Sequence, residues 1–231
     1  RDNVVVRAQA ASGKSTTFLH AARAWIAAHP AGGKVVILCF NVNLRAASEA
    51  RVAELGLDDR VHCFTVHSLA SQINGVGIGD TLTLLKYLES AGECPDDYDL
   101  CLVDEAQDLS GTMVAVINQL QQLREDRMRY MVVGDRRQAI YDFAREAEPE
   151  ALTKPETTLR PNGAGWTTCE LNESYRVTPP IAAFLNEHFR HPDDTPIVGA
   201  NTRSQQVTPE YVVGDAARGD LITLITEQLA V

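Results

Sequence analysis

The sequence lacks a long hydrophobic run, a cysteine pairing pattern and an excess of positive charge. No apolar stretch in its 231 residues approaches the roughly 20 that a membrane-spanning helix needs, so we expect a soluble protein with no membrane contact. Its five cysteines are scattered without CxxC spacing, and three of them lie in apolar runs. Buried thiols of this kind indicate a reducing, intracellular compartment, and not a secreted scaffold.

The beginning of the chain and its charge set further limits. The first residues have neither the basic segment nor the apolar stretch of an export signal, and Arg1 stands in place of a starting Met. We therefore expect a fragment or a processed product. The formal net charge is -10, so any contact with phosphate groups must come from a local patch, because the long-range field repels nucleic acid.

Short β-branched or apolar runs alternate along the chain with longer segments of helical spacing. The runs are residues 4–6, 35–40, 61–66, 100–103 and 130–133. Helices are predicted at residues 15–28, 44–55 and 112–123. This alternation is typical of an α/β fold, in which a parallel sheet is covered by helices on both faces.

A change of composition divides the chain. Residues 146–165 are rich in proline and glycine and have little apolar periodicity, which predicts a linker or a long loop. Beyond it we expect a strand at residues 166–171 and helices at 180–189 and 221–230. The predicted organisation is one α/β unit at residues 1–148, a linker at 149–165 and a partial second unit at 166–231.

A phosphate-binding loop is predicted between the first strand and the first helix. The segment AQAASGKST at residues 8–16 matches GxxxxGK[ST], except that Ala8 occupies the first glycine position. A loop that leads into a helix N-terminus aims backbone N–H groups and the helix dipole at the β- and γ-phosphates of ATP. Lys14 supplies positive charge and Ser15 can ligate Mg²⁺. The predicted ATP-binding residues here are Ala10, Ala11, Ser12, Gly13, Lys14, Ser15 and Thr16. The alternative is an ordinary strand-to-helix turn with an incidental GKS.

Two further strand ends carry candidate catalytic groups. The acidic segment DEAQD at residues 104–108 follows a buried run, and side chains at the carboxyl end of a parallel strand face the ligand crevice. Asp104 is predicted to hold Mg²⁺ through water, and Glu105 to polarise the water that attacks the γ-phosphorus. Gln138 is predicted to contact the γ-phosphate. The alternatives are a solvated acidic helix start and an exposed helical glutamine.

Six segments in order, AASGKS, FNVNLRAASEAR, TVHSLA, DEAQD, VVGDRRQAIYDF and LNESYR, resemble the successive motifs of superfamily-one helicases of the UvrD/Rep type. The resemblance implies a P-loop NTPase with a RecA-like first lobe at residues 1–148 and the start of a second RecA-like lobe at 166–231. It implies a motor that hydrolyses ATP with Mg²⁺ and steps along single-stranded DNA, with RNA left open. We expect a monomer, either alone or within a longer polypeptide or complex; DNA repair is the family's usual role.

The resemblance also assigns residues that spacing alone does not. Tyr175 is expected to stack on the adenine, and Arg176 to reach the γ-phosphate from the second lobe. The candidates for contact with the nucleic-acid strand are Phe40, Asn41, Thr65, His67, Tyr141 and Phe143, because aromatic faces stack on bases while small polar groups hold phosphates. The alternatives are a structural histidine at 67 and a core phenylalanine at 40.

Three departures from the family pattern leave rival functions open. Ala11 stands where relatives carry Gly, and its Cβ opposes a strained backbone. Residues 68–95 leave almost no room for the accessory insertion of UvrD, and the chain stops at Val231, before the late motifs of the second lobe. One rival is a nucleotide switch or binding module without unwinding activity. The other is an unrelated P-loop enzyme such as a small-molecule kinase, against which DEAQD and LNESYR argue.

Overall fold

A parallel sheet organises the computed structural model, which describes residues 2–88, 92–139, 150–190, 192 and 194–203. Within these residues six strands lie in the order β3-β2-β4-β5-β1-β6, and every neighbouring pair is parallel. The strands are β1 (Asn3–Ala8), β2 (Lys34–Cys39), β3 (Val61–Thr65), β4 (Tyr98–Val103), β5 (Arg129–Gly134) and β6 (Trp166–Leu171). The predicted α/β class and the first five strand positions are confirmed.

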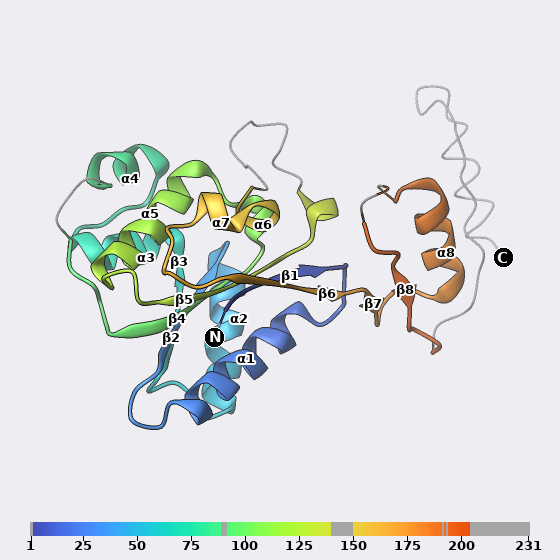
Figure 1. Ribbon diagram of the computed structural model, residues 1–231, viewed down its shortest axis with the longest axis horizontal. Helices are drawn as coiled ribbons and strands as arrows, with labels where there is room; N and C mark the ends of the chain where they lie inside the picture. The colour runs from blue at the N-terminus through green and yellow to red at the C-terminus, as the bar shows by residue number, and fades with distance from the viewer. Residues whose placement is uncertain (1, 89–91, 140–149, 191, 193, 204–231) are drawn as a thin grey trace.

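Helices cover both faces of this sheet, as Figure 1 shows. One face packs against α1 (Lys14–Ala28) and α2 (Val42–Glu54), and the other against α3 (Val66–Asn74), α5 (Gly111–Leu123) and α6 (Glu150–Thr153). Because strand side chains alternate between faces, Val35 and Ile37 of β2 join one core while Val36 and Leu38 join the other. Near-continuous apolar strands follow from this two-sided burial.

The predicted linker at residues 149–165 is wrong. It contains two short helices, α6 and α7 (Pro155–Thr158). Leu152 within α6 and Leu159, which ends α7, belong to the main core. Asn162 then fixes the chain to the sheet, because its Nδ2 donates to Asn3 Oδ1 at 2.8 Å and to Met128 O at 2.7 Å. The prolines that suggested a linker instead lie in a connection that is packed against the core.

The strand at residues 166–171 is confirmed, but its place in a second unit is not. β6 pairs with β1 in parallel over six residues, from Asn3 opposite Trp166 to Ala8 opposite Leu171, and so completes the first sheet. After it come β7 (Glu173–Ser174), α8 (Pro179–His188) and β8 (Val198–Gly199), with β7 and β8 forming a small parallel pair. That these begin a second lobe stays a proposal, and the helix predicted at 221–230 lies outside the described residues.

Sequence reasoning did not identify two helices between β3 and β4. α3 begins at Val66, where the Thr65 side chain accepts from Ser68 N and Ser68 Oγ accepts from Thr65 N. α4 (Thr81–Tyr87) begins where Asp80 accepts from Thr83 N. Such capping side chains satisfy the free N–H groups of a first turn.

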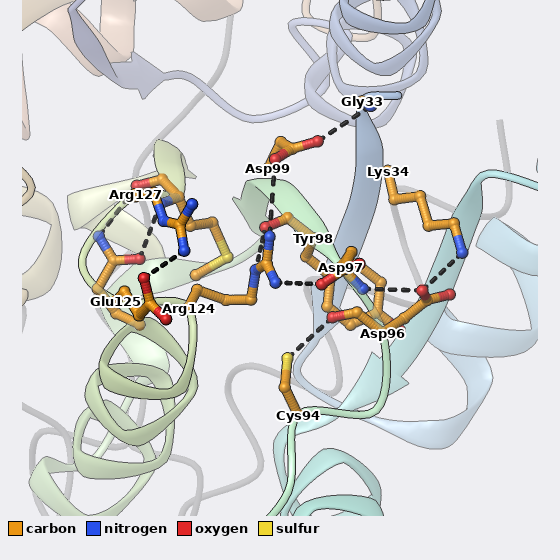
Figure 2. Close-up of polar contacts among 12 residues, drawn as sticks. Gly33, Lys34, Cys94, Asp96, Asp97, Tyr98, Asp99, Arg124, Glu125 and Arg127 are labelled. Atoms are coloured by element: carbon orange, nitrogen blue, oxygen red, sulfur yellow. Dashed lines mark hydrogen bonds and ion pairs between the residues drawn. The ribbon is translucent and has the colours of Figure 1, made fainter. Parts of the chain in front are cut away.

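Polar contacts join the loops at the amino end of the strands, opposite the predicted site (Figure 2). Lys34 Nζ lies 2.6 Å from Asp96 Oδ1, and Arg124 Nε donates to Tyr98 O at 2.8 Å. Gly33 N donates to Asp99 Oδ2 at 3.0 Å. These contacts tie the beginning of β2 and the end of α5 to the beginning of β4.

Among the described residues, no helix combines the length and the apolar character that crossing a bilayer requires. The five cysteines are free thiols, and three of them, Cys39, Cys63 and Cys101, are buried. Burial raises the pKa of the Cys39 thiol to about 11, so it stays protonated at neutral pH.

Candidate active site at the carboxyl edge of the sheet

The predicted site residues follow the carboxyl ends of neighbouring strands, where a parallel sheet binds its ligands. The phosphate loop follows β1, Asp104 and Glu105 follow β4, and Gln138 lies in the short helix η2 (Arg136–Gln138) after β5. Tyr175 and Arg176 directly follow β7, which comes shortly after β6 in the chain. Since β4, β5, β1 and β6 are adjacent in the sheet, one edge gathers groups that are far apart in the chain.

The phosphate loop bends through two left-handed residues. Gly13 has φ 90° and is the N-cap of α1, and Ala11 has φ 56°. The first conformation suits glycine, whereas the second costs a residue with a Cβ about 1 kcal/mol. α1 begins at Lys14 and none of its first-turn residues is acidic, so its free N–H groups face the cleft without an internal anion.

Lys14 is the electrostatic centre of the site. Its Nζ lies 3.4 Å from Glu105 Oε2 and 3.4 Å from Gln138 Oε1, and its side chain is only 11% exposed. The predicted phosphate-binding cation, catalytic carboxylate and γ-phosphate sensor are therefore brought together. Glu105 itself has φ 48°, a backbone conformation that is rare for a residue with a side chain.

Asp104 is buried beneath Lys14, Glu105 and Gln138. It is 8% exposed, and its Oδ1 accepts from Glu105 N at 3.0 Å. Burial, and next the charge of Glu105, raise the pKa of the Asp104 carboxyl to about 6. The same two causes raise the pKa of Asp108 to about 6. Carboxyls whose pKa is raised by burial and by a neighbouring charge are typical of functional sites.

Gln107 is a site residue that sequence reasoning missed. It is 1% exposed; its Nε2 donates to Glu105 Oε2 at 2.9 Å, and its Oε1 accepts from Asp135 N at 3.0 Å. It thereby fixes the Glu105 carboxylate relative to the end of β5. Gly134 permits this contact, because a Cβ there would lie 2.4 Å from Gln107 Oε1. A glutamine inside DEAQD carries no sequence signal that its partner is Asp135.

A cleft of about 430 Å³ joins these groups. It is lined by Ala11, Ser12, Gly13, Lys14, Ser15, Thr16, Arg51, Glu105, Gln138, Tyr175 and Arg176. Tyr175 is 66% exposed, so its ring is free to receive a planar group. Arg51 was missed, although it belongs to the segment FNVNLRAASEAR that carried the resemblance. Its place near the end of α2 gives the cleft a third cation beside Lys14 and Arg176.

The candidates for nucleic-acid contact lie further along the same edge. Phe40 and Asn41 line a second open cleft of about 440 Å³ together with Glu105 and Gln138. Asn41 is also the N-cap of α2 and accepts from Leu44 N at 2.9 Å. Thr65 is a buried cap of α3, and His67 lies in the first turn of that helix.

Two of the candidates cannot be placed. Tyr141 and Phe143 lie outside the described residues. The roles of Phe40, Asn41, Thr65 and His67 stay predictions as well, and the capping of α2 and α3 already accounts for Asn41 and Thr65.

The donor groups present suit Mg²⁺. Among the described residues no group of three or more His, Cys, Asp or Glu side chains could hold a metal ion by itself. Mg²⁺ keeps several waters and is usually held by one or two protein oxygens together with substrate phosphates. The hydroxyl of Ser15 in the cleft and the carboxyl of Asp104 beneath it are such oxygens.

The raised pKa of Asp104 has a measurable effect on stability. Its folded pKa of about 6 exceeds the ordinary value of 3.8, so this group stabilises the fold below about pH 4 and the stabilisation is lost as pH rises through 6. Asp104→Asn should therefore raise the unfolding free energy by about 1–3 kcal/mol at pH 8, and by little at pH 4. Denaturant unfolding without nucleotide or Mg²⁺ measures it. The exposed Asp59→Asn is the matched control, and an equal effect of both variants would contradict the prediction.

Comparison with known proteins points to the same part of the chain. The sequence profile of a family described as an AAA domain matches residues 1–144. An ATP-dependent helicase/nuclease subunit of Natranaerobius thermophilus is 31% identical over 104 residues, which cover 45% of this chain. The chain spans 8% of the length of that relative. The family and the relative's name agree with the resemblance to superfamily-one helicases.

Two solved structures are similar over most of the chain. The Pif1 helicase from Candida albicans is 16% identical with a TM-score of 0.48, and the match covers 76% of this chain and 37% of that one. Bacteroides Pif1 bound to ssDNA is 16% identical with a TM-score of 0.44, over 81% of this chain and 42% of that one.

Proposed function

Because the chain belongs to the family described as an AAA domain, we propose that its cleft binds and hydrolyses ATP as the motor core of a single-strand DNA helicase or translocase. The observation that carries the proposal is the convergence of Glu105 and Gln138 on Lys14 at the start of α1. The name of the Natranaerobius relative, with its ATP-dependent helicase activity, supports the choice of a nucleic-acid motor.

The residues divide the chemistry as follows. The N–H groups of the phosphate loop and Lys14 hold the β- and γ-phosphates, and Tyr175 stacks on the adenine. Glu105 accepts the proton of the attacking water, oriented by its hydrogen bond from Gln107. Gln138 reports the γ-phosphate because it already contacts Lys14. Arg176 stabilises the negative charge that develops as the bond to the leaving phosphate lengthens.

Ser15 and Asp104 would hold Mg²⁺. When bound, the ion neutralises phosphate charge and so makes the γ-phosphorus easier to attack. The ion would also relieve the repulsion between Asp104 and Glu105 that contributes to the raised pKa of Asp104.

The nucleic-acid strand would cross the carboxyl edge of the sheet beside the bound nucleotide. Phe40 and Asn41 share their cleft with Glu105 and Gln138, so a strand held there lies next to the hydrolytic groups. Stacking on aromatic side chains is tolerant of sequence, which suits a motor that moves along any strand.

The test is hydrolysis of ATP by the full chain in the presence and absence of an unstructured oligonucleotide. We expect Mg²⁺-dependent release of phosphate that oligo-dT stimulates severalfold, and oligo-U in parallel distinguishes DNA from RNA. ATP binding with no release of phosphate under any condition would favour the nucleotide switch. Phosphate transfer to a small acceptor, in place of water, would favour the kinase.

A further inference from the structure

The phosphate loop is held by a segment that is distant in the chain. Ser174 Oγ donates to Ala10 O at 2.7 Å, and Tyr175 N donates to Ala11 O at 3.1 Å. Two successive carbonyls of the loop therefore accept hydrogen bonds from two successive residues after β6. We call these two contacts the clasp.

The backbone and the side chain of Ser174 are both held in place. It is 0% exposed, and its O accepts from Ala200 N at 2.9 Å within the β7–β8 pair. Its Oγ also accepts from Val177 N at 3.3 Å, so the hydroxyl hydrogen is directed to Ala10 O. A buried hydroxyl with both roles satisfied has one orientation.

The loop needs such support at the residues that the clasp holds. Ala11 has φ 56°, which a residue with a Cβ rarely adopts, and no glycine stands there to relieve it. Without the clasp this peptide is free to leave the left-handed region, and the N–H groups that follow it would then point away from the phosphates.

We propose that Ser174 is a positioning residue, which holds the phosphate loop in its nucleotide-binding bend and joins it to Tyr175 and Arg176. The proposal rests on the proposed function, in that the loop binds nucleotide. Because the clasp and the two cleft residues share one stretch of backbone, the loop, the adenine platform and the arginine are placed as a unit. A movement of that stretch would alter all three together.

The test is a double-mutant cycle on nucleotide affinity. Ser174→Ala in the full chain should weaken the binding of a fluorescent ATP analogue about fivefold, the effect of losing one buried hydrogen bond. Adding Ala11→Gly should restore most of that loss, since glycine adopts the left-handed bend without help. The Ala11→Gly single variant completes the cycle, so that its own effect on affinity is subtracted from that of the double variant.

Thr178→Val is the matched control, because Thr178 is 3% exposed in the same stretch and its hydroxyl contacts no described polar group. It should leave affinity unchanged. Ser174→Cys keeps the side-chain volume but donates weakly, so it tests the contact if the alanine variant unfolds; it should weaken binding in the same direction. Unchanged affinity in both Ser174 variants, or failure of Ala11→Gly to restore binding, would overturn the proposal.

A second readout separates the clasp from the proposed function. Amide hydrogen exchange of residues 10–13 should accelerate in Ser174→Ala and not in Thr178→Val, with no nucleotide present. If the wild type binds no nucleotide, yet exchange in the loop is faster in Ser174→Ala than in Thr178→Val, the proposed function fails and the clasp stands. If exchange in the loop is the same in all variants, the clasp fails whatever the chain hydrolyses.

Discussion

Glu105→Gln should bind ATP about as well as the wild type and lose about 10²–10⁴-fold in turnover, the usual contribution of a general base. The amide is close in shape to the carboxylate and can still accept the hydrogen bond from Gln107 Nε2. It cannot take the proton from the attacking water. Removing a negative charge 3.4 Å from Lys14 Nζ also favours phosphate binding, so affinity should not fall.

Single-turnover hydrolysis, with affinity measured in its own titration, separates these effects. Glu49→Gln is the matched control: it makes the same chemical change in an exposed ion pair with Arg45 on α2. It should leave both quantities unchanged. Normal turnover in Glu105→Gln would remove Glu105 from its role as the base.

Lys14→Ala should lower the affinity for ATP about a hundredfold, a loss of about 3 kcal/mol, as expected when one partner of a largely buried charge pair is truncated. The Lys14 side chain is 11% exposed, and its ammonium lies within 3.4 Å of both Glu105 and Gln138. Without it, the carboxylates of Glu105 and Asp104 would face the phosphates uncompensated.

Calorimetric titration with a non-hydrolysable ATP analogue measures this loss. Lys34→Ala is the control, because Lys34 also forms an ion pair, with Asp96, but at the amino end of the strands. Its affinity for ATP should match that of the wild type. An equal loss in both variants would mean that the Lys14 effect is general destabilisation.

The sheet could be predicted because its strands are buried on both faces. Near-continuous apolar runs such as β2 and β4 are typical of parallel strands, and the helices between them keep helical spacing. The segment at 149–165 was misjudged because proline marks turns in linkers and in packed connections alike. Its burial depends on Leu152 and Leu159 reaching a core that is distant in sequence.

In the site, too, some residues could be predicted from the sequence and others could not. That Lys14, Glu105 and Gln138 come together could be predicted from the order of their motifs and from the strand ends that carry them. Their roles stay predictions. Gln107, Arg51 and Ser174 were missed because their partners are set by tertiary contacts that one sequence does not display. The left-handed Ala11 was foreseen only as a departure from glycine, and not as the residue that another segment supports.

The strand order fixes a length within the molecule. From β2, which leads to Phe40 and Asn41, to β1, which leads to the phosphate loop, the sheet crosses β4 and β5, or three spacings. At about 4.8 Å each, these amount to roughly 14 Å. Because every neighbouring pair in this sheet is held by a ladder of backbone hydrogen bonds, we expect this separation to stay nearly constant during hydrolysis. In the proposed motor, the movement along the nucleic acid must therefore come from parts of the molecule outside this sheet.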